Sequence, residues 1–251
     1  MIFHARNIIQ SYLLIVFTGI TISCSKANNF QMPPSQPIDS VPATTSNNDT
    51  IKRTYLALGD SYTIGQSVPV NDRYPMQTIK LLNSGGFHFS DPEIIATSGW
   101  TTVNLEAAIN THHFADSIYD IVTLLIGVND QYQGSTQSEY KNQFTVLLQK
   151  SIQFAGNKAS HVIVISIPDY SVTPFATNSN KALIGREIDS FNIINRQISA
   201  AYEVNYIDIT DESRKAATDE TLIASDGLHF TGKEYAIWSA MLAAKIKKIL
   251  Q

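Results

Sequence analysis

The chain has 251 residues, of which 43% are hydrophobic and 16% are charged, and its formal net charge is −4. That length is enough for one sizeable core, and the composition is that of a globular protein. A slightly acidic chain without a basic stripe is a poor partner for nucleic acid, which we therefore exclude. The only cysteine, Cys24, lies near the N-terminus, so the rest of the chain has no disulfide and no thiolate metal site.

The six histidines are scattered along the chain, and only His112 and His113 are adjacent. No carboxylate with metal-ligand spacing accompanies this pair, and metal ligands normally come as a fuller set. We therefore interpret the pair as surface residues and expect neither a metal nor a cofactor.

Residues 1–23 have the pattern of an export signal. A short basic start precedes the nearly unbroken apolar run 8–22, which is short for a membrane span and typical of a signal peptide. Ser23 and Cys24 resemble the lipobox of bacterial lipoproteins, although Thr21 stands where leucine is usual. That resemblance implies cleavage before Cys24 and acylation of this residue. The alternative is a plain signal peptide with an incidental cysteine.

Residues 24–51 are rich in Ser, Asn, Pro, Gln and Thr and nearly free of bulky apolar side chains. Such a segment cannot bury a core, so we predict a flexible tether between Cys24 and the folded domain. The expected product is an exported, monomeric protein of the cell envelope or periplasm. Its only membrane attachment is the lipid anchor at Cys24, where several acyl chains would hold the protein stably at a bilayer.

Strand-like and helix-like segments alternate from residue 52 to residue 251. Short apolar, β-prone runs predict five strands, over residues 55–58, 93–97, 121–126, 161–167 and 204–209. Helical spacing and helix-start residues predict helices that begin at Pro75, at Thr101 or Thr102, at Ser138, near Ile184, and at the capping box Thr231–Glu234. This alternation predicts one α/β domain over residues 52–251, with a parallel sheet between two layers of helices.

Ligands of a parallel α/β sheet bind outside the carboxyl ends of its strands. Polar segments follow the first, second, third and fifth predicted strands: Gly59–Ser61, Ser98–Thr101, Gly127–Asp130 and Asp226–Thr231. Each of these segments, taken alone, is common as a cap, a turn or a loop. Their joint occurrence at one edge of the sheet predicts a site for acyl transfer.

Ser61 is the candidate nucleophile, because a serine released at a helix start after a strand lies among unpaired backbone N–H groups. His229 is the candidate base that takes its proton, and Asp226 can hold the other ring nitrogen. The Ser61 N–H, the Gly99 N–H and the Asn129 side-chain amide are the candidate oxyanion donors. The structural alternatives are a helix cap at Ser61, a turn at Gly99 and a hydrogen-bonded structural role for His229.

In this order, the four segments match the four blocks of the SGNH (GDSL) hydrolases, and the resemblance extends from about Thr54 to the C-terminus. One departure is Tyr62, which stands in place of the leucine of the family's name motif. The resemblance implies a flavodoxin-like, three-layer fold and metal-free hydrolysis of carboxylic esters or thioesters through an acyl-enzyme on Ser61.

The first expectation is a lysophospholipase-like acylhydrolase. The alternatives are a carbohydrate acetylesterase and a non-catalytic binding domain on the same fold. A flavin or phosphate binder is disfavoured, because the carboxylate of Asp60 would repel phosphate groups.

Three further residues are candidates for substrate binding. Arg73 follows the nucleophile segment and can hold a polar group of the substrate or form a salt bridge at a helix start. Tyr170 and Phe175 lie in the long loop 168–176, which looks exposed and can line an acyl pocket or pack as an ordered loop; residues 130–134 are a second candidate rim. The sequence does not set the depth of the pocket. A small pocket would favour acetyl removal from sugars, and a long groove would favour lysophospholipids or acyl thioesters.

Overall fold

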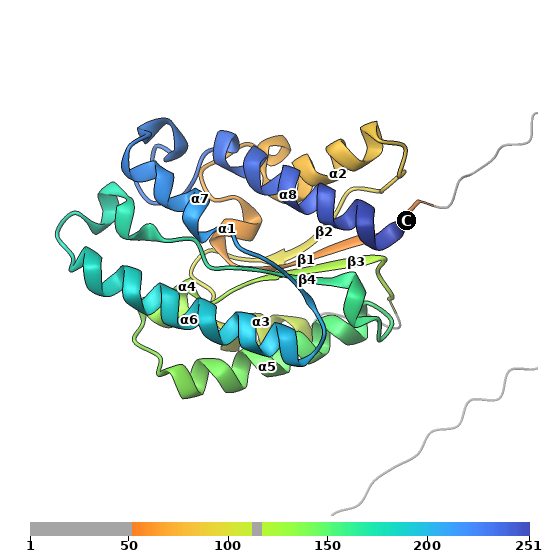
Figure 1. Cartoon of the computed structure of the whole chain (residues 1–251), viewed down its shortest axis with the longest axis horizontal. Coiled ribbons are helices and arrows are strands. Elements are labelled where there is room, and N and C mark those ends of the chain that lie inside the picture. The colour runs from red at the N-terminus through yellow and green to blue at the C-terminus, as the bar shows by residue number, and fades with distance from the viewer. Residues whose placement is uncertain (1–51, 112–116) are drawn as a thin grey trace, which may run out of the picture. The chain divides into compact units, whose positions relative to one another are not determined.

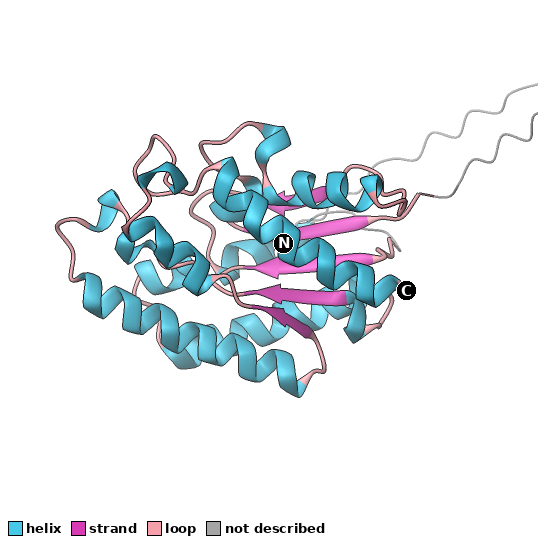
Figure 2. Ribbon diagram, turned by 45° about the horizontal axis from the view of Figure 1, so that its top comes forward, coloured by secondary structure: helices cyan, strands magenta, loops and turns pink. Residues whose placement is uncertain are grey.

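A five-stranded, fully parallel sheet forms the centre of the part of the chain that the computed structural model describes, residues 52–111 and 117–251. The strand order is β2-β1-β3-β4-β5, and helices cover both faces (Figure 1; Figure 2). The predicted α/β fold with a parallel sheet between helices is therefore confirmed. The strands are β1 (Tyr55–Gly59), β2 (Glu93–Ala96), β3 (Ile121–Leu125), β4 (Val162–Ile165) and β5 (Asn205–Ile207).

Helices α2 and α8 pack together on one face of the sheet, and α3, α5 and α6 lie on the other (Figure 1). The helices are α1 (Ser61–Ile64), α2 (Tyr74–Ser84), α3 (Thr102–Thr111), α4 (Val128–Tyr132), α5 (Gln137–Phe154), α6 (Lys181–Ala201), α7 (Thr210–Arg214) and α8 (Gly232–Leu250). Short 3-10 helices occupy several connections: η1 (Val70–Asp72), η2 (Ala159–His161), η3 (Tyr170–Val172), η4 (Pro174–Ala176), η5 (Lys215–Ala217) and η6 (Glu220–Leu222).

The predicted signal segment 1–23, the tether 24–51 and the pair His112 and His113 lie outside the described residues. Within the ranges that the structure does describe, no helix combines the length and apolar character needed to cross a bilayer.

The register of the central strands sets the position of the site. Gly59, the last residue of β1, pairs with Ala96 at the end of β2 and with Leu125 at the end of β3. The three strands therefore end level with one another, and the segments that follow them meet at one edge. Every residue of β1 and of β3 is buried, as expected for strands covered on both faces.

The predicted capping box at the start of α8 is wrong. The Thr231 hydroxyl donates to the carbonyl of Thr221 (2.9 Å), and the Glu234 carboxylate accepts from the Trp238 indole N–H (2.7 Å). Tertiary partners therefore take both side chains that the local pattern assigned to the cap. A capping box is found instead at the start of α5, where Thr136 and Glu139 bond reciprocally.

An aromatic cluster fills the space between α8, α2 and the start of α1. The Trp238 ring lies 4.9 Å from Tyr235, 5.6 Å from Phe230, 6.4 Å from Tyr74 and 6.5 Å from Tyr62, centroid to centroid. The rings are tilted or edge-on, the geometries that aromatic pairs prefer. Because Tyr62 follows Ser61 and Phe230 follows His229, this cluster joins the two segments that carry the candidate nucleophile and base.

Gly127 joins β3 to α4 in a conformation that excludes other residues. Its φ is +127°, and a Cβ at this position would lie 2.5 Å from the Tyr140 hydroxyl. That hydroxyl is buried and donates to the side-chain oxygen of Asn195 (2.6 Å), so it is not free to move away. The turn that leads to Asn129 therefore requires glycine both for its dihedral angles and for space.

We expect Gly127→Ala to lower the free energy of unfolding by about 2–4 kcal/mol, since backbone strain and overpacking add. The matched control is Gly134→Ala beyond the end of α4, where φ is +79° but no atom lies within 4 Å of the added methyl group. That variant should lose only about 1–2 kcal/mol. Urea denaturation of both proteins measures the difference, and equal losses would contradict the role given to Tyr140.

Candidate active site

Ser61 is the first residue of α1, and only Asp60 separates it from the end of β1. Asp60 caps this short helix by accepting a hydrogen bond from the backbone N–H of Tyr62 (3.0 Å). Backbone N–H groups in the first turn of a helix have no intrahelical acceptor, so the Ser61 N–H is available to an anion beside the Ser61 hydroxyl. The strand end thus presents one residue with both a nucleophile and a donor.

His229 and Asp226 form a compact pair in the segment before α8. The ring Nδ1 of His229 lies 2.7 Å from one carboxylate oxygen of Asp226. The other oxygen accepts from the backbone N–H groups of Leu228 and His229, at 3.0 Å each. With Nδ1 donating to the carboxylate, Nε2 is the ring nitrogen left to accept a proton.

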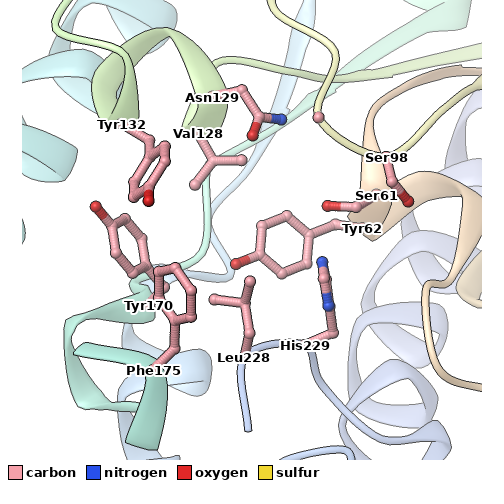
Figure 3. Close-up of a pocket in the computed structure, with 11 residues that line it drawn as sticks. Ser61, Tyr62, Ser98, Val128, Asn129, Tyr132, Tyr170, Phe175, Leu228 and His229 are labelled. Atoms are coloured by element: carbon pink, nitrogen blue, oxygen red, sulfur yellow. The ribbon is translucent and has the colours of Figure 1, made fainter. Parts of the chain in front are cut away.

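Ser61 and His229 line the same cavity from different segments (Figure 3). Within the described residues the Ser61 hydroxyl and the His229 ring are not joined by a hydrogen bond. Hydrogen bonds of this kind are often long in ligand-free sites and shorten when the substrate is bound. The structure therefore places Ser61 and His229, the candidate nucleophile and base, at one cavity without a hydrogen bond between them.

Ser67 is a third partner of Asp226 that the sequence did not reveal. Its hydroxyl donates to the same carboxylate oxygen that holds His229, at 2.5 Å. Ser67 adopts a φ of +66°, in the left-handed region that side chains rarely occupy. Burial raises the pKa of Asp226, but the hydrogen bonds from Ser67, His229 and Leu228 outweigh it and hold this pKa well below its ordinary value. Asp226 is therefore a carboxylate across the working pH range.

The candidate oxyanion donors Gly99 and Asn129 come from neighbouring loops and line the cavity with Ser61. One N–H of the Asn129 side chain donates to the carbonyl of Trp100 (2.9 Å), which fixes the amide and leaves the second N–H for a ligand. Gly99 has a φ of +83°, and a Cβ there would meet no protein atom within 4 Å. This position favours glycine for its backbone conformation.

Asp130 binds the two oxyanion segments together. Its carboxylate accepts from the backbone N–H (2.9 Å) and the hydroxyl (2.5 Å) of Thr102, at the start of α3. Asn129 makes its bond to Trp100 one residue earlier. Two adjacent residues of α4 therefore hold the segment that contains Gly99 at a fixed distance from the Asn129 amide.

The nucleophile cavity, as we call the space beside Ser61 and His229, has a volume of about 200 Å³. Its walls are mainly apolar and aromatic. Figure 3 shows side chains from several loops facing it. The lining residues are Ser61, Tyr62, Ser98, Gly99, Val128, Asn129, Tyr132, Tyr170, Phe175, Leu228 and His229.

Three aromatic rings form one side of this cavity. Tyr132, Tyr170 and Phe175 lie with their ring centroids 5.9 to 6.3 Å apart. Tyr132 and Phe175 are 60% and 47% exposed, whereas Tyr170 is only 4% exposed, so our interpretation of Tyr170 as an exposed loop residue is wrong. The loop folds into two 3-10 helices and packs Val172 against the core instead of the cavity.

Arg73 does not line the nucleophile cavity, but it lines an adjoining one. Ser98 belongs to the walls of both. The sequence analysis did not identify Tyr62 and Leu228 as lining residues. Tyr62 follows Ser61 directly, and Leu228 lies between Asp226 and His229. No group of three or more metal-ligating side chains that could hold a metal ion occurs in residues 52–111 or 117–251.

Comparisons with known proteins agree with the geometry. A model of the GDSL-like lipase/acylhydrolase family matches residues 57–237. A lipase/acylhydrolase from Enterococcus faecalis is 19% identical, with a TM-score of 0.59 over 78% of this chain and 96% of that one. An acetylxylan esterase from Geobacillus stearothermophilus is 17% identical, with a TM-score of 0.58 over 77% and 94%. A psychrotrophic esterase from Pseudoalteromonas sp. is 19% identical, with a TM-score of 0.56 over 79% and 99%.

No curated protein matches the chain. At identities of 17% to 19%, the solved structures show a shared fold only. The assignment of the chain to a family rests on the family model. The resemblance to SGNH hydrolases inferred from the four segments is thereby confirmed.

Asp60 is fully buried, and one of its carboxylate oxygens has no hydrogen-bond partner among the described residues. Burial raises its pKa to about 8; the hydrogen bond from Tyr62 opposes this shift, and the nearby charge of Asp130 adds to it. The Asp60 carboxyl group, next to Ser61 in the sequence, is therefore protonated at neutral pH, and the expectation that its negative charge would repel phosphate groups is wrong.

A pH dependence of stability follows from this shift. Between about pH 4, the ordinary carboxyl value, and about pH 8, the folded chain keeps a proton on Asp60 that the unfolded chain has lost. The free energy of unfolding should therefore fall as pH rises, by at most about 1.4 kcal/mol per unit from this group.

Asp60→Asn keeps the acceptor for Tyr62 and cannot titrate. We expect the stability of the wild type relative to this variant to decline with rising pH across that range, in urea denaturation at several pH values. The control is Asp91→Asn, which changes an exposed carboxylate. A constant difference between wild type and Asp60→Asn would show that Asp60 is ionised in the folded chain.

Proposed function

The chain belongs to the GDSL-like lipase/acylhydrolase family and is an ester-hydrolysing enzyme, and from its site geometry we propose that it works through an acyl-enzyme on Ser61. The observation that carries the proposal is the 2.7 Å contact between His229 and Asp226 at the wall of the cavity that Ser61 also lines. Because the chain is an ester-hydrolysing enzyme of this family, the alternative of a non-catalytic binding domain is set aside.

In the first half-reaction, Nε2 of His229 takes the proton of the Ser61 hydroxyl as the oxygen attacks the ester carbonyl carbon. The carbon–oxygen bond to the alcohol then breaks, and the imidazolium gives its proton to the departing alkoxide. The ionised Asp226 stabilises the imidazolium throughout. The alcohol leaves, and the acyl group remains bound to Ser61 as an ester.

In the second half-reaction, a water molecule gives a proton to His229 and attacks the acyl carbon. The bond to the Ser61 oxygen breaks, this oxygen recovers the proton, and the carboxylic acid leaves. In both halves the carbonyl oxygen becomes negative, and the N–H groups of Ser61, Gly99 and Asn129 stabilise that charge. Each such donor is worth about 3–4 kcal/mol of barrier in comparable sites.

The nucleophile cavity limits the acyl group. Its volume of about 200 Å³ is somewhat larger than the ~150 Å³ apolar cavity that holds one benzene molecule. An acyl chain of roughly two to eight carbons fits such a space, whereas a long lysophospholipid chain would extend out of it. We therefore propose an acylhydrolase for short to medium acyl esters or thioesters.

A carbohydrate acetylesterase is the second candidate. The exposed rings of Tyr132 and Phe175 at the edge of the cavity are tilted by 50° to each other and provide apolar ring faces against which a sugar ring can pack. Acetylxylan esterases are among the proteins of similar structure. In this case the cavity would take the acetyl group and the aromatic rings would contact the sugar.

Hydrolysis of p-nitrophenyl esters of increasing chain length by wild type and Ser61→Ala tests both parts of the proposal. We expect kcat/KM to be highest for chains of roughly two to eight carbons, and Ser61→Ala to lower it by at least ~10³-fold. The control is Ser190→Ala on the surface of α6, whose hydroxyl only donates to the carbonyl of Arg186. If Ser61→Ala still turns over the esters, the proposed acyl-enzyme on Ser61 is wrong. If kcat/KM still rises at a chain length of sixteen carbons, the proposed limit on the acyl chain is wrong.

We also propose, from the sequence alone, that the chain is exported to the cell envelope or periplasm, anchored through an acylated Cys24, and monomeric. Cells that express the protein should then incorporate labelled palmitate into it, and Cys24→Ala should abolish the label and release the protein into the soluble fraction. Ser25→Ala is the matched control. Equal labelling and equal membrane fractions for wild type and Cys24→Ala would contradict the anchor.

A further inference from the structure

A second cavity adjoins the nucleophile cavity. It has a volume of about 320 Å³, and we call it the Arg73 cavity. Ser98 lines both cavities, and Ser67, the partner of Asp226, lines the second. An ester bound at Ser61 has two arms, an acyl arm and an alcohol arm. If the apolar nucleophile cavity holds the acyl arm, the adjoining cavity is the space open to the alcohol arm.

Arg73 provides an unpaired positive charge in the wall of this cavity. Its side chain is half-buried, and its Nε lies fully buried without a hydrogen-bond partner among the described residues. No ion pair to Arg73 occurs within residues 52–111 and 117–251 either. By contrast, Arg214 bonds to Asp169 (2.9 Å) and Asp189 (2.6 Å). A partly buried guanidinium without an anion is unusual, because buried polar groups are nearly always paired.

The position of Arg73 is fixed by packing across the turn that ends α1. A Cβ on Gly65, whose φ is +68°, would lie 2.4 Å from Cγ of Arg73. The side chain therefore lies directly against the backbone of the segment that follows Ser61. The side chain thus lines the Arg73 cavity with its Nε unpaired in the described part of the chain.

Among the other polar groups of the cavity, the Gln66 amide is the donor that stays free within the described residues, because the hydroxyls of Ser67 and Ser98 already donate to Asp226 and to Gln66. The side-chain oxygen of Gln66 accepts from the Ser98 hydroxyl (2.5 Å), which leaves the two amide hydrogens of Gln66 without an acceptor among the described residues. Thr97 also lines the space. Asp226 is the nearest site carboxylate, and its oxygens already accept hydrogen bonds from Ser67, His229 and Leu228.

We propose that the Arg73 cavity is the subsite for the alcohol arm and selects esters whose alcohol carries an anionic group, a carboxylate or a phosphate. This inference rests on the proposed acyl-enzyme mechanism, because it assigns the leaving group of that reaction. The guanidinium of Arg73 binds the anion and the Gln66 amide donates to it; partial burial strengthens the attraction between the two opposite charges.

Two matched pairs of esters test the subsite. One pair is 3-acetoxybenzoate and its neutral amide, 3-acetoxybenzamide. The other is 1-butyrylglycerol 3-phosphate and the neutral 1-butyrylglycerol. Within each pair the acyl group is the same, so the ratio of kcat/KM values reports recognition of the alcohol. We expect the anionic member of at least one pair to be preferred by about tenfold, and the pair with the larger ratio identifies carboxylate or phosphate as the better ligand.

Three variants separate charge from packing. Arg73→Gln should bring the preference close to unity, because it removes the charge that binds the anion. Gln66→Glu, at an exposed position, keeps the acceptor for Ser98 and adds a negative charge, so it should also abolish the preference. The control is Arg53→Gln, which removes an arginine that lies over the ring of Phe87.

The possible results distinguish the subsite from the reaction. The subsite is overturned if the wild type shows Ser61-dependent turnover but its anionic-to-neutral ratio of kcat/KM is near unity. It is also overturned if Arg73→Gln and Gln66→Glu both leave this ratio unchanged. Either result leaves the esterase mechanism intact. If Arg73→Gln does not fold, Gln66→Glu alone decides. If no Ser61-dependent turnover is found, the proposed mechanism fails, and with it the assignment of a leaving group. Calorimetry with 3-hydroxybenzoate and 3-hydroxybenzamide then tests whether the Arg73 cavity binds anions. Equal binding of the two compounds overturns anion binding as well.

Discussion

The candidate site depends on the packing of aromatic rings around Trp238. Ser61 and His229 lie far apart in the sequence, and each is followed directly by a ring of this cluster, Tyr62 or Phe230. The Tyr62 ring also contacts the His229 ring edge-on at 5.4 Å. Each such pair contributes about 0.5–1.5 kcal/mol beyond the burial of its surface. The nucleophile and base are thus positioned by the core between α8 and α1.

A second, polar connection fixes the oxyanion side. Asp130 holds Thr102 and Asn129 holds Trp100, so the loop with Gly99 is bound to α4 through side chains from two adjacent residues. Oxyanion donors lower a barrier only if they are oriented before the charge develops, since reorienting them during the reaction would cost free energy. In this protein the orientation is supplied by the hydrogen bonds that Asp130 accepts from Thr102 and that Asn129 donates to Trp100, and the donors themselves are uncharged N–H groups.

The sequence was sufficient for the sheet and for the positions of the site segments, because apolar strands, short connections and the rule that ligands bind at carboxyl ends are local or topological properties. It failed where a side chain had a choice of partners. The Thr231–Glu234 pattern fits a capping box, but the indole of Trp238 takes the glutamate. Tyr170 lies in a polar, proline-containing loop and is nevertheless buried.

The hydrogen bond of Ser67 and the unpaired state of Arg73 were beyond prediction for a related reason. The bond from Ser67 to Asp226 joins two distant parts of the chain, and it forms because Ser67 adopts a left-handed conformation that no sequence pattern announces. Arg73 was a candidate from its position after the nucleophile, but the absence of an ion pair in the described residues could only be seen in three dimensions.

The two cavities divide the chemical demands of ester hydrolysis. Apolar walls around the acyl arm reduce the amount of water near the ester, and fewer water molecules strengthen the donors that face the carbonyl oxygen. Deacylation then needs water on the side from which the alcohol departed. The Arg73 cavity is lined there by the exposed side chains of Gln66, Ser67 and Ser98, so under the proposed mechanism it fills with solvent as soon as the alcohol leaves. The same polar wall that recognises the leaving group would therefore also admit the water that completes the reaction.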